Sequence, residues 1–304
     1  LALFLLTPKA NRMKRGKSRR LFKKKKSHSN QRLGCIIAII VLIPICYGLY
    51  LYYQQYSVQH SSKPQIETSV SLPTPSGKDL EIPISLIPRQ EQIIRHKGYT
   101  VSYNKDLKIP NWVSYELTRQ ETKGKEKRGD NFIADPLVKG AIATNADYAR
   151  SGYDKGHMAP AADMKWSPDV MKESFYFSNM CPQHPQLNRR GWKNLEEKIR
   201  DWAVADSAII IICGPIIDKP SKTIGKNKVA VPERFFKVIL SPFVKPARGI
   251  GFLFNNRQAV EPLSTYAVSI DSIEKLTHMD FFSPLPDEIE NAVEANADYY
   301  QWPR

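Results

Sequence analysis

The most constraining feature of this sequence is a stretch of twenty-one residues, 33–53, that contains no charged side chain. It reads LGCIIAIIVLIPICYGLYLYY, and at about 1.5 Å per helical residue it would span roughly the 30 Å of a bilayer's hydrocarbon core. Tyrosines gather at its end, where an aromatic belt would meet the membrane surface. A cleaved signal peptide is the alternative, but the stretch is longer than a signal-peptide core and lacks a small-x-small cleavage site. The sequence therefore predicts one N-terminal transmembrane anchor.

The net charge of +15 is concentrated on the N-terminal side of this anchor. Residues 1–32 hold twelve lysines and arginines and no acid, which leaves only +3 for residues 54–304. The basic composition is therefore no sign that the rest of the chain binds nucleic acid. Because positively charged flanks stay in the cytoplasm, we expect a basic cytoplasmic tail at 1–32 and a periplasmic or extracellular remainder.

The remainder divides into a linker and one domain. Residues 54–79 are polar and proline-containing, without apolar periodicity, and predict a linker. Apolar patterning begins at Leu80, and residues 80–304 are long enough for one sizeable core. Short apolar runs predict strands, the first two forming a hairpin, at 100–103, 112–117, 174–178, 208–213, 235–240 and 251–254.

One helix is expected after Asn188. Trp192, Leu195, Ile199 and Trp202 recur at spacings of three, four and three residues, which is the apolar stripe of an amphipathic helix. Several strands with few helices predict an α+β fold with an antiparallel sheet core.

Only two cysteines, Cys181 and Cys213, lie in the predicted exported domain. An oxidising compartment would allow a disulfide between them, and the sequence leaves this open. Neither has the neighbours of a zinc quartet.

Residues suited to chemistry concentrate in two stretches about thirty positions apart. The first runs from Tyr153 to Pro160 and places His157 outside any amphipathic pattern. A neutral imidazole can accept a proton near neutral pH, so His157 is a candidate general base. In the second stretch, Asn188 and Glu196 fall on one broad face of the predicted helix, where an amide oxygen and a carboxylate could hold a hard cation such as Mg²⁺.

Taken in order, these motifs resemble the DNA/RNA non-specific endonucleases, a family that includes secreted bacterial nucleases and mitochondrial endonuclease G. The resemblance rests on Asp154-Lys155-Gly156-His157 with the Met-Ala-Pro-Ala that follows, on Asn179-Met-Cys-Pro-Gln183, and on Asn188 with Trp192 and Glu196. Other segments agree, among them Asn111-Trp112-Val113-Ser114-Tyr115, Phe132 with Asp135-Pro136, Gly214-Pro215-Ile216, and Val231-Pro232 with Phe235-Phe236-Lys237-Val238. The resemblance covers roughly residues 80–290 and implies a ββα-metal, or His-Me finger, active site.

The resemblance implies a metal-dependent, sugar-non-specific endonuclease that leaves 5′-phosphate and 3′-hydroxyl ends. It makes His157 the general base and Asn188 the one direct ligand of Mg²⁺, with Mn²⁺ as the alternative ion. Glu196 would act on the metal through a water. Lys155, Arg128 and Arg200 would supply positive charge at the phosphate.

Asp154, Asn179 and Gln183 are expected to brace this site. Lys155 stands where the family usually has arginine, and because lysine cannot fork onto a phosphate, we expect a modest change in rate or substrate preference. The implied partners are DNA and RNA without strong sequence preference, the membrane through residues 33–53, and a possible homodimer. Two alternatives remain: a catalytically weak nucleic-acid-binding or DNA-uptake protein, and a phosphodiesterase acting on a small substrate.

Overall fold

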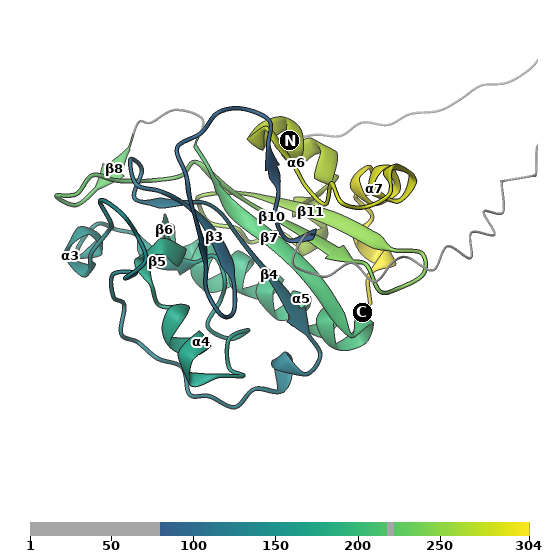
Figure 1. The fold of residues 1–304 in the computed structure, drawn as a ribbon, viewed down its shortest axis with the longest axis horizontal. Coiled ribbons are helices and arrows are strands. Elements are labelled where there is room, and N and C mark those ends of the chain that lie inside the picture. Colours follow the sequence, from purple (N-terminus) through teal and green to yellow (C-terminus); the bar gives the residue numbers. More distant parts are fainter. Residues whose placement is uncertain (1–79, 218–221, 304) are drawn as a thin grey trace, which may run out of the picture. The chain divides into compact units, whose positions relative to one another are not determined.

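The computed structural model describes residues 80–217 and 222–303. Its centre is a seven-stranded sheet in the order β12-β11-β10-β7-β4-β3-β2, and each neighbouring pair is antiparallel (Figure 1). Its strands are β2 (Gln92–Arg95), β3 (Thr100–Asn104), β4 (Ile109–Thr118), β7 (Ala208–Ile216), β10 (Arg234–Ser241), β11 (Arg248–Asn255) and β12 (Ala267–Val268). The predicted antiparallel sheet core is confirmed, and β3 and β4 form the predicted early hairpin.

Smaller elements surround this sheet. Three two-stranded ladders pair β1 (Ile84–Ser85) with β13 (Met279–Asp280), β5 (Asp154–His157) with β6 (Met180–Gln183), and β8 (Thr223–Ile224) with β9 (Val229–Ala230). The α-helices are α3 (Asn145–Tyr148), α4 (Pro168–Glu173), α5 (Lys193–Asp206), α6 (Ile270–Thr277) and α7 (Asp287–Glu294). Short 3₁₀ turns are η1 (Glu121–Lys123), η2 (Phe177–Asn179), η4 (Leu263–Tyr266) and η5 (Tyr299–Gln301), and η3 (Leu187–Trp192) is a π-helical turn.

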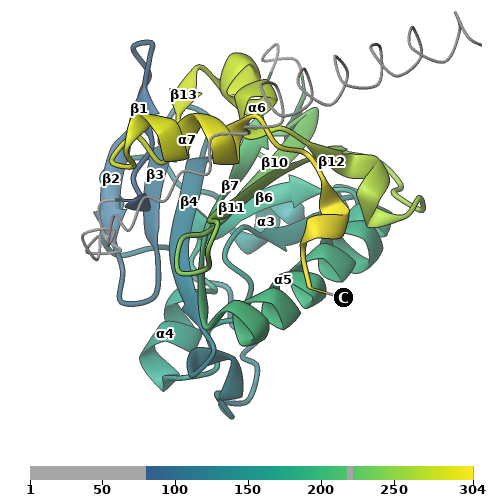
Figure 2. The same cartoon turned by 90° about the vertical axis from the view of Figure 1, so that its right-hand side faces the viewer.

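The central strand β7 shows why the sheet is covered on both faces. All of its residues are buried, and successive side chains of a strand point to opposite faces. Ile209 and Ile211 belong to the core that includes α5, whereas Ile210 and Ile212 belong to the core that includes α6 and α7. Figure 2 shows α6 and α7 on one side of the strands and α5 on the other. A continuous apolar run is therefore what this position in the fold requires.

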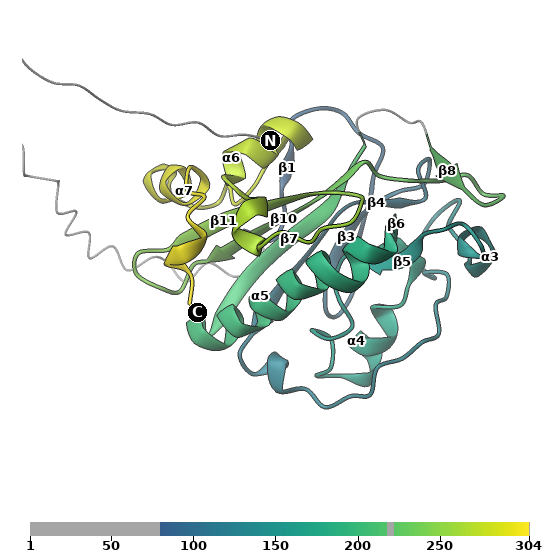
Figure 3. The ribbon, with the colours of Figure 1, turned by 180° about the vertical axis from the view of Figure 1, so that it is seen from behind.

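The predicted amphipathic helix is α5, preceded by the π-helical turn η3. Figure 3 shows α5 running across the sheet, with β5 and β6 beside its start. Leu195, Ile199 and Trp202 are fully buried, as the apolar spacing predicts. Asn188 lies in the π-helical turn, however, so the α-helical rotation that the sequence suggested between Asn188 and Glu196 does not apply. Such turns inside helices are frequent at functional sites.

The strand predicted at 174–178 was wrong. Ser174 caps the end of α4, and Phe177 begins the turn η2. The backbone N–H groups of Ser174 and Tyr176 bond to carbonyls three or four residues earlier, those of Val170 and Glu173. Strand-like pairing is limited to one isolated bridge between Tyr176 and Ile133. A short apolar run cannot by itself show whether it forms a strand or a buried turn. Here the run directly follows α4 and continues as turns.

No helix in the described part of the chain is long and apolar enough to cross a bilayer. The basic tail, anchor and linker predicted at 1–32, 33–53 and 54–79 lie outside the described residues.

Candidate active site

The candidate site is built by the β5–β6 ladder and the start of the helical segment that leads into α5. Asp154 pairs with Gln183 and His157 pairs with Met180, so the first predicted motif forms one strand and the second begins on the other. The indole Nε1 of Trp192 donates a hydrogen bond of 3.3 Å to the carbonyl of His157 and ties the helical segment to the ladder. Two strands followed by a helix thus hold the predicted residues, which is the arrangement that the resemblance implied.

A cavity of about 480 Å³ opens where these elements meet. It is lined by every residue predicted to act in catalysis, metal binding or phosphate contact: Arg128, Lys155, His157, Asn188, Glu196 and Arg200. These residues are spread over 73 positions of the chain, and only folding brings them together.

His157 is a buried part of the cavity wall, with 7% of the residue accessible. Its ring lies edge-on to Phe175, 5.0 Å away, and 5.6 Å from the ring of Phe132. Burial, with the positive charges of Arg128 and Lys155 nearby, lowers the pKa of His157 to about 3. The imidazole is therefore neutral at physiological pH and able to accept a proton.

Asn188 is held by a carboxylate from the opposing strand. Its side-chain nitrogen donates a hydrogen bond of 2.9 Å to Asp154 Oδ2. This bond assigns the nitrogen to the Asp154 side and leaves the amide oxygen as the free acceptor. Arg189 Nε and Nη2 close a bidentate pair on the same carboxylate at 2.8 and 2.7 Å. Asp154 was predicted only to brace the site, and its position suits that role.

Glu196 lies on the α5 side of the cavity. Burial raises the pKa of its carboxyl to about 7, although the positive charge of Lys237 acts in the opposite direction. Lys237 is itself wholly buried and lies 4.6 Å from the ring of Trp192. A carboxyl and an amide oxygen on one cavity wall are donors of the kind that a hard cation prefers.

Arg200 is anchored by an acid that sequence reasoning missed. Its Nη1 donates to Asp163 Oδ1 at 2.8 Å, and the hydroxyl of Tyr115 donates to the other oxygen at 2.9 Å. Asp163 is wholly buried, so Arg200 is held in place from beneath while it lines the cavity. No sequence signal marked Asp163, because its partner lies 37 residues further along the chain.

The other two predicted cations rest on aromatic rings. Lys155 Nζ lies 4.2 Å from the centre of the Phe132 ring and donates to Asn145 Oδ1 at 2.9 Å. The Arg128 guanidinium lies 5.4 Å from the centre of the Phe175 ring. Cations over aromatic faces are attracted by the ring electrons, so the rings fix the charges without neutralising them.

Sequence reasoning also missed two basic residues of the cavity, Arg189 and Lys193. Lys193 forms an i,i+4 pair of 3.5 Å with Glu197 at the cavity rim. Their positions in the predicted helix were visible, but a basic residue on a helix has no distinguishing signal without the cavity beside it.

Asn179 and Gln183 do not reach the cavity. Asn179 is wholly buried and exchanges two hydrogen bonds of 2.8 Å with the backbone of Ala159, directly after the His157 strand. Gln183 is also wholly buried, and its side chain occupies the space beside Gly156, where an added Cβ would come within 2.3 Å of the amide oxygen. Glycine at this position is therefore required for the ladder to close. Both residues lie behind the cavity, and their role in bracing the site stays a prediction.

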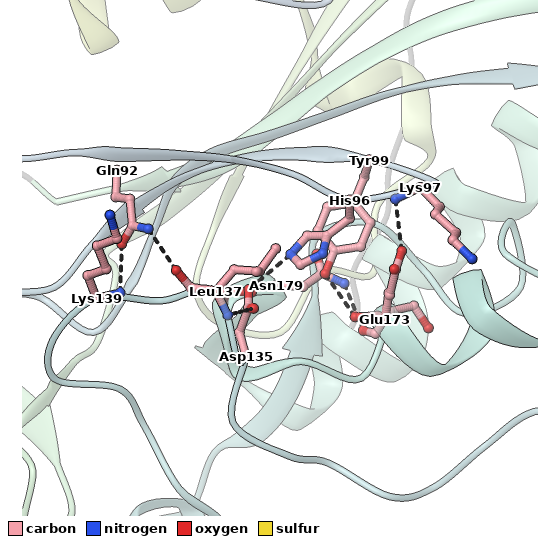
Figure 4. Close-up of polar contacts among 11 residues, drawn as sticks. Gln92, His96, Lys97, Tyr99, Asp135, Leu137, Lys139, Glu173 and Asn179 are labelled. Atoms are coloured by element: carbon pink, nitrogen blue, oxygen red, sulfur yellow. Dashed lines mark hydrogen bonds and ion pairs between the residues drawn. The ribbon is translucent and has the colours of Figure 1, made fainter.

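A second polar network supports the loop that carries Phe132 (Figure 4). His96 Nε2 lies 2.9 Å from Asp135 Oδ2, and Ser178 Oγ donates to the same oxygen at 2.6 Å. Burial would raise the pKa of Asp135, but the hydrogen bonds from His96, Ser178 and the backbone of Leu137 hold it below its ordinary value. The charged carboxylate thus joins the β2–β3 hairpin to the loop and to the segment that leads into β6.

Cys181 and Cys213 are free thiols, both buried. Cys213 donates to the carbonyl of Met158, and burial raises the pKa of its thiol to about 11. The disulfide that the sequence left open is not formed.

Comparison with known proteins shows that this chain is similar to nucleases. Residues 76–288 match the model of the DNA/RNA non-specific endonuclease family. The chain is 30% identical over 250 residues to a nuclease of Nostoc sp. (strain PCC 7120 / SAG 25.82 / UTEX 2576). The matched region covers 77% of this chain and 88% of the relative. It is 33% identical over 213 residues to the mitochondrial endonuclease G of Homo sapiens, covering 64% of this chain and 71% of the relative.

A solved structure agrees in fold. A chain in a crystal structure of the EndoG/EndoGI complex superposes with a TM-score of 0.61 at 29% identity, covering 66% of this chain and 89% of that chain.

Proposed function

The chain belongs to the DNA/RNA non-specific endonuclease family and is an endonuclease, and we propose that it hydrolyses phosphodiester bonds of both DNA and RNA in a metal-dependent reaction. The observation that carries this proposal is the composition of one cavity. It combines a neutral buried imidazole, an amide oxygen held free for a cation, and the side chains of Arg128, Lys155, Arg189, Lys193 and Arg200.

His157 would take the proton from the attacking water. Its lowered pKa keeps the imidazole unprotonated, so the base is available over the whole physiological range. The rings of Phe132 and Phe175 restrict its orientation, which favours a fixed position for the accepting nitrogen.

Asn188 would hold the metal directly, and Glu196 would act through an intervening water. The donor set fits Mg²⁺, because it offers oxygen atoms on one wall and leaves room in the cavity for water. When bound there, Mg²⁺ would offset negative charge on the phosphate and on the departing 3′ oxygen. Asp154 fixes the amide by its hydrogen bond, as partners behind a metal ligand commonly do.

The cations of the cavity would receive the phosphate backbone. Arg128 and Lys155 rest on aromatic rings and Arg200 on a buried acid, so each is positioned before substrate arrives. Contacts to phosphate carry no base information, which accounts for cleavage without sequence preference. The resulting ends would be a 5′-phosphate and a 3′-hydroxyl.

We also propose that residues 33–53 anchor the enzyme in a membrane, with the basic tail in the cytoplasm and the nuclease domain on the other side. The support is the charge pattern of residues 1–53. A reporter that is active only outside the cytoplasm, fused after residue 304, should give signal, and a silent reporter would exclude this orientation. Sedimentation of the detergent-solubilised chain would test the homodimer that the family resemblance implies.

The first test of the activity uses the full chain in detergent, plasmid DNA and total RNA, and either Mg²⁺ or EDTA. We expect degradation of both substrates with Mg²⁺ only, and a loss of about 10²–10⁴-fold in rate for His157→Ala. His184→Ala is the matched control, since His184 lies next to Gln183 but does not line the cavity. DNA fragments that a ligase rejoins without prior phosphorylation would carry the expected ends. Binding of DNA by folded protein without any cleavage would instead favour a nucleic-acid-binding relative.

A further inference from the structure

A second cluster of ionisable groups lies on the other face of the sheet, between α6 and α7 and beside β13. Figure 1 shows the two helices next to each other. Five acidic residues gather there: Asp271, Glu274, Asp280, Glu290 and Glu294. The proposed endonuclease chemistry uses none of them, and the strands of the sheet separate them from the cavity.

Three of the five offer oxygen atoms to one point. One carboxylate oxygen each of Asp271, Glu274 and Glu294 lies within 4.8 Å of the other two. Asp271 and Glu274 come from α6, one turn apart, and Glu294 is the last residue of α7. The group therefore joins two helices that are separated in sequence.

Glu294 is the observation that points to a ligand. The residue is only 6% exposed, and its Oε1 is buried without a hydrogen-bond partner. A buried polar atom left without a partner is costly, so such atoms in folded proteins normally have one. The C-terminal end of a helix carries partial negative charge, and the last turn of α7 contains no basic residue that would offset it.

No positive side chain of the described residues pairs with this cluster. The ion pairs found at 80–217 and 222–303 engage other acids, and Glu274 receives only the backbone N–H of Phe281, at 2.8 Å. Burial and the neighbouring carboxylates raise the pKa of Glu294 to about 9.

We propose that Asp271, Glu274 and Glu294 form a binding site for a divalent cation of the size of Ca²⁺. Three oxygens that bind one Ca²⁺ at about 2.6 Å lie about 4.5 Å apart when they are evenly spaced around it, so the separation of up to 4.8 Å in this cluster needs only a small adjustment of the side chains. For Mg²⁺, at about 2.1 Å, the corresponding separation is about 3.6 Å, and the geometry is stricter. Glu290 and Asp280 supply further negative charge nearby.

A cation at this position would clamp α6 to α7. The two helices cover the sheet through Ile270, Ile273 and Val293, all of them buried, so the clamp would stabilise this layer of the domain. It would take no part in the chemistry of the cavity, because it lies on the opposite face of the sheet.

The experiment measures Ca²⁺ binding by calorimetry, and thermal unfolding after removal of metals, on the full chain in detergent. Asn188→Ala is used as background to remove the proposed ligand at the active site. We expect one Ca²⁺ per chain and a rise in Tm of about 5 °C at a Ca²⁺ concentration well above the dissociation constant. Mg²⁺ at the same concentration should raise the Tm less.

Two variants in that background decide the outcome. Glu294→Gln should abolish Ca²⁺ binding and the Tm rise, whereas Glu288→Gln, an exposed acid on the same helix, should retain both. If Glu294→Gln does not fold, Asp271→Asn at the half-exposed start of α6 replaces it. The proposal would be overturned if the Asn188→Ala chain bound no Ca²⁺, or if binding survived the loss of Glu294 or Asp271. The three carboxyl groups would then be held together by shared protons and not by a cation.

Discussion

The two faces of the central sheet carry ionisable groups under opposite conditions. In and beneath the cavity, three acids each have a cation near them: Asp163 has Arg200, Asp154 has Arg189, and Glu196 has Lys237. On the face covered by α6 and α7, Glu274 and Glu294 form no ion pair with any described residue; their charged neighbours are other acids, and Glu274 accepts one backbone N–H. Burial raises carboxyl pKa values on both faces, so burial alone does not distinguish them.

The difference lies in which sign of charge is in excess. The cavity retains more cations than its acids can pair, which suits a polyanionic substrate. The α6–α7 cluster retains carboxyl groups that no described cation pairs with, which suits a bound cation. A surplus of one sign at a buried position therefore indicates the charge of the missing partner. Four predictions test this contrast, from the largest expected effect to the smallest.

The largest effect should come from breaking the pair beneath the cavity. Arg200→Met keeps the volume but leaves the buried carboxylate of Asp163 without its cation. We expect a loss of about 3 kcal/mol in the free energy of unfolding, near the lower limit for such pairs because Tyr115 still donates to Asp163. Urea unfolding measures it. Arg190→Met, at an exposed position nearby, is the control, and an equal effect of the two changes would show that the pair contributes little.

Asp154→Ala should weaken Mg²⁺ binding without touching the proposed metal ligand. The change removes the acceptor that holds the Asn188 amide, and we expect about 10–100-fold more Mg²⁺ to be needed for half-maximal cleavage. The measurement is initial rate against Mg²⁺ concentration. Glu197→Ala at the cavity rim should leave the Mg²⁺ requirement unchanged. If the Asp154 variant needs no more Mg²⁺ than the unchanged chain, Asp154 does not contribute to metal binding.

Two groups in the same cavity should give opposite dependences of stability on pH, measured in EDTA. The pKa of His157 is lowered to about 3, so its contribution to stability is present above about pH 6.5 and is lost as the pH falls. At pH 5 the expected loss is about 2 kcal/mol relative to neutral pH, and His157→Gln should remove it.

The pKa of Glu196 is raised to about 7, so its contribution is present below about pH 4.5 and is lost as the pH rises through 7. Because the two contributions change in opposite directions between about pH 4.5 and 6.5, Glu196→Gln should steepen the loss of stability as the pH falls, whereas His157→Gln should leave a stability that falls as the pH rises toward 7. Parallel profiles for the two variants would show that neither group is buried as the structure has it.

The smallest effect should follow Lys155→Arg, which tests how far cation geometry matters in the cavity. Lys155 already donates to Asn145 and rests on Phe132, so its charge is in place. We expect a change in kcat of about threefold or less, whereas Lys155→Met, which removes the charge, should cost about tenfold or more. A large gain for arginine in cleavage of plasmid DNA would show that forked contact to the phosphate is required.

Much of the site could be predicted because its residues lie in two short, ordered motifs. His157, Asn188 and Glu196 were placed from residue type and order, and the cavity brings all three together. The segment at 174–178 could not be predicted, since its apolar residues suit a strand and a buried turn equally. Asp163 and Lys237 could not be predicted either, because each owes its role to partners that are distant in the chain.

The sequence by itself determined the kinds of groups available and the order in which they occur. It determined that a base, an amide and a carboxylate follow one another at spacings that a ladder and a helix can bring together. The tertiary structure alone decided which acid meets which cation and which acids meet none. Pairing and burial depend on distances across the fold, and those distances set the pKa values of His157, Glu196 and Glu294. The order of residues carries no record of such distances, because electrostatic interactions act through space and not along the chain.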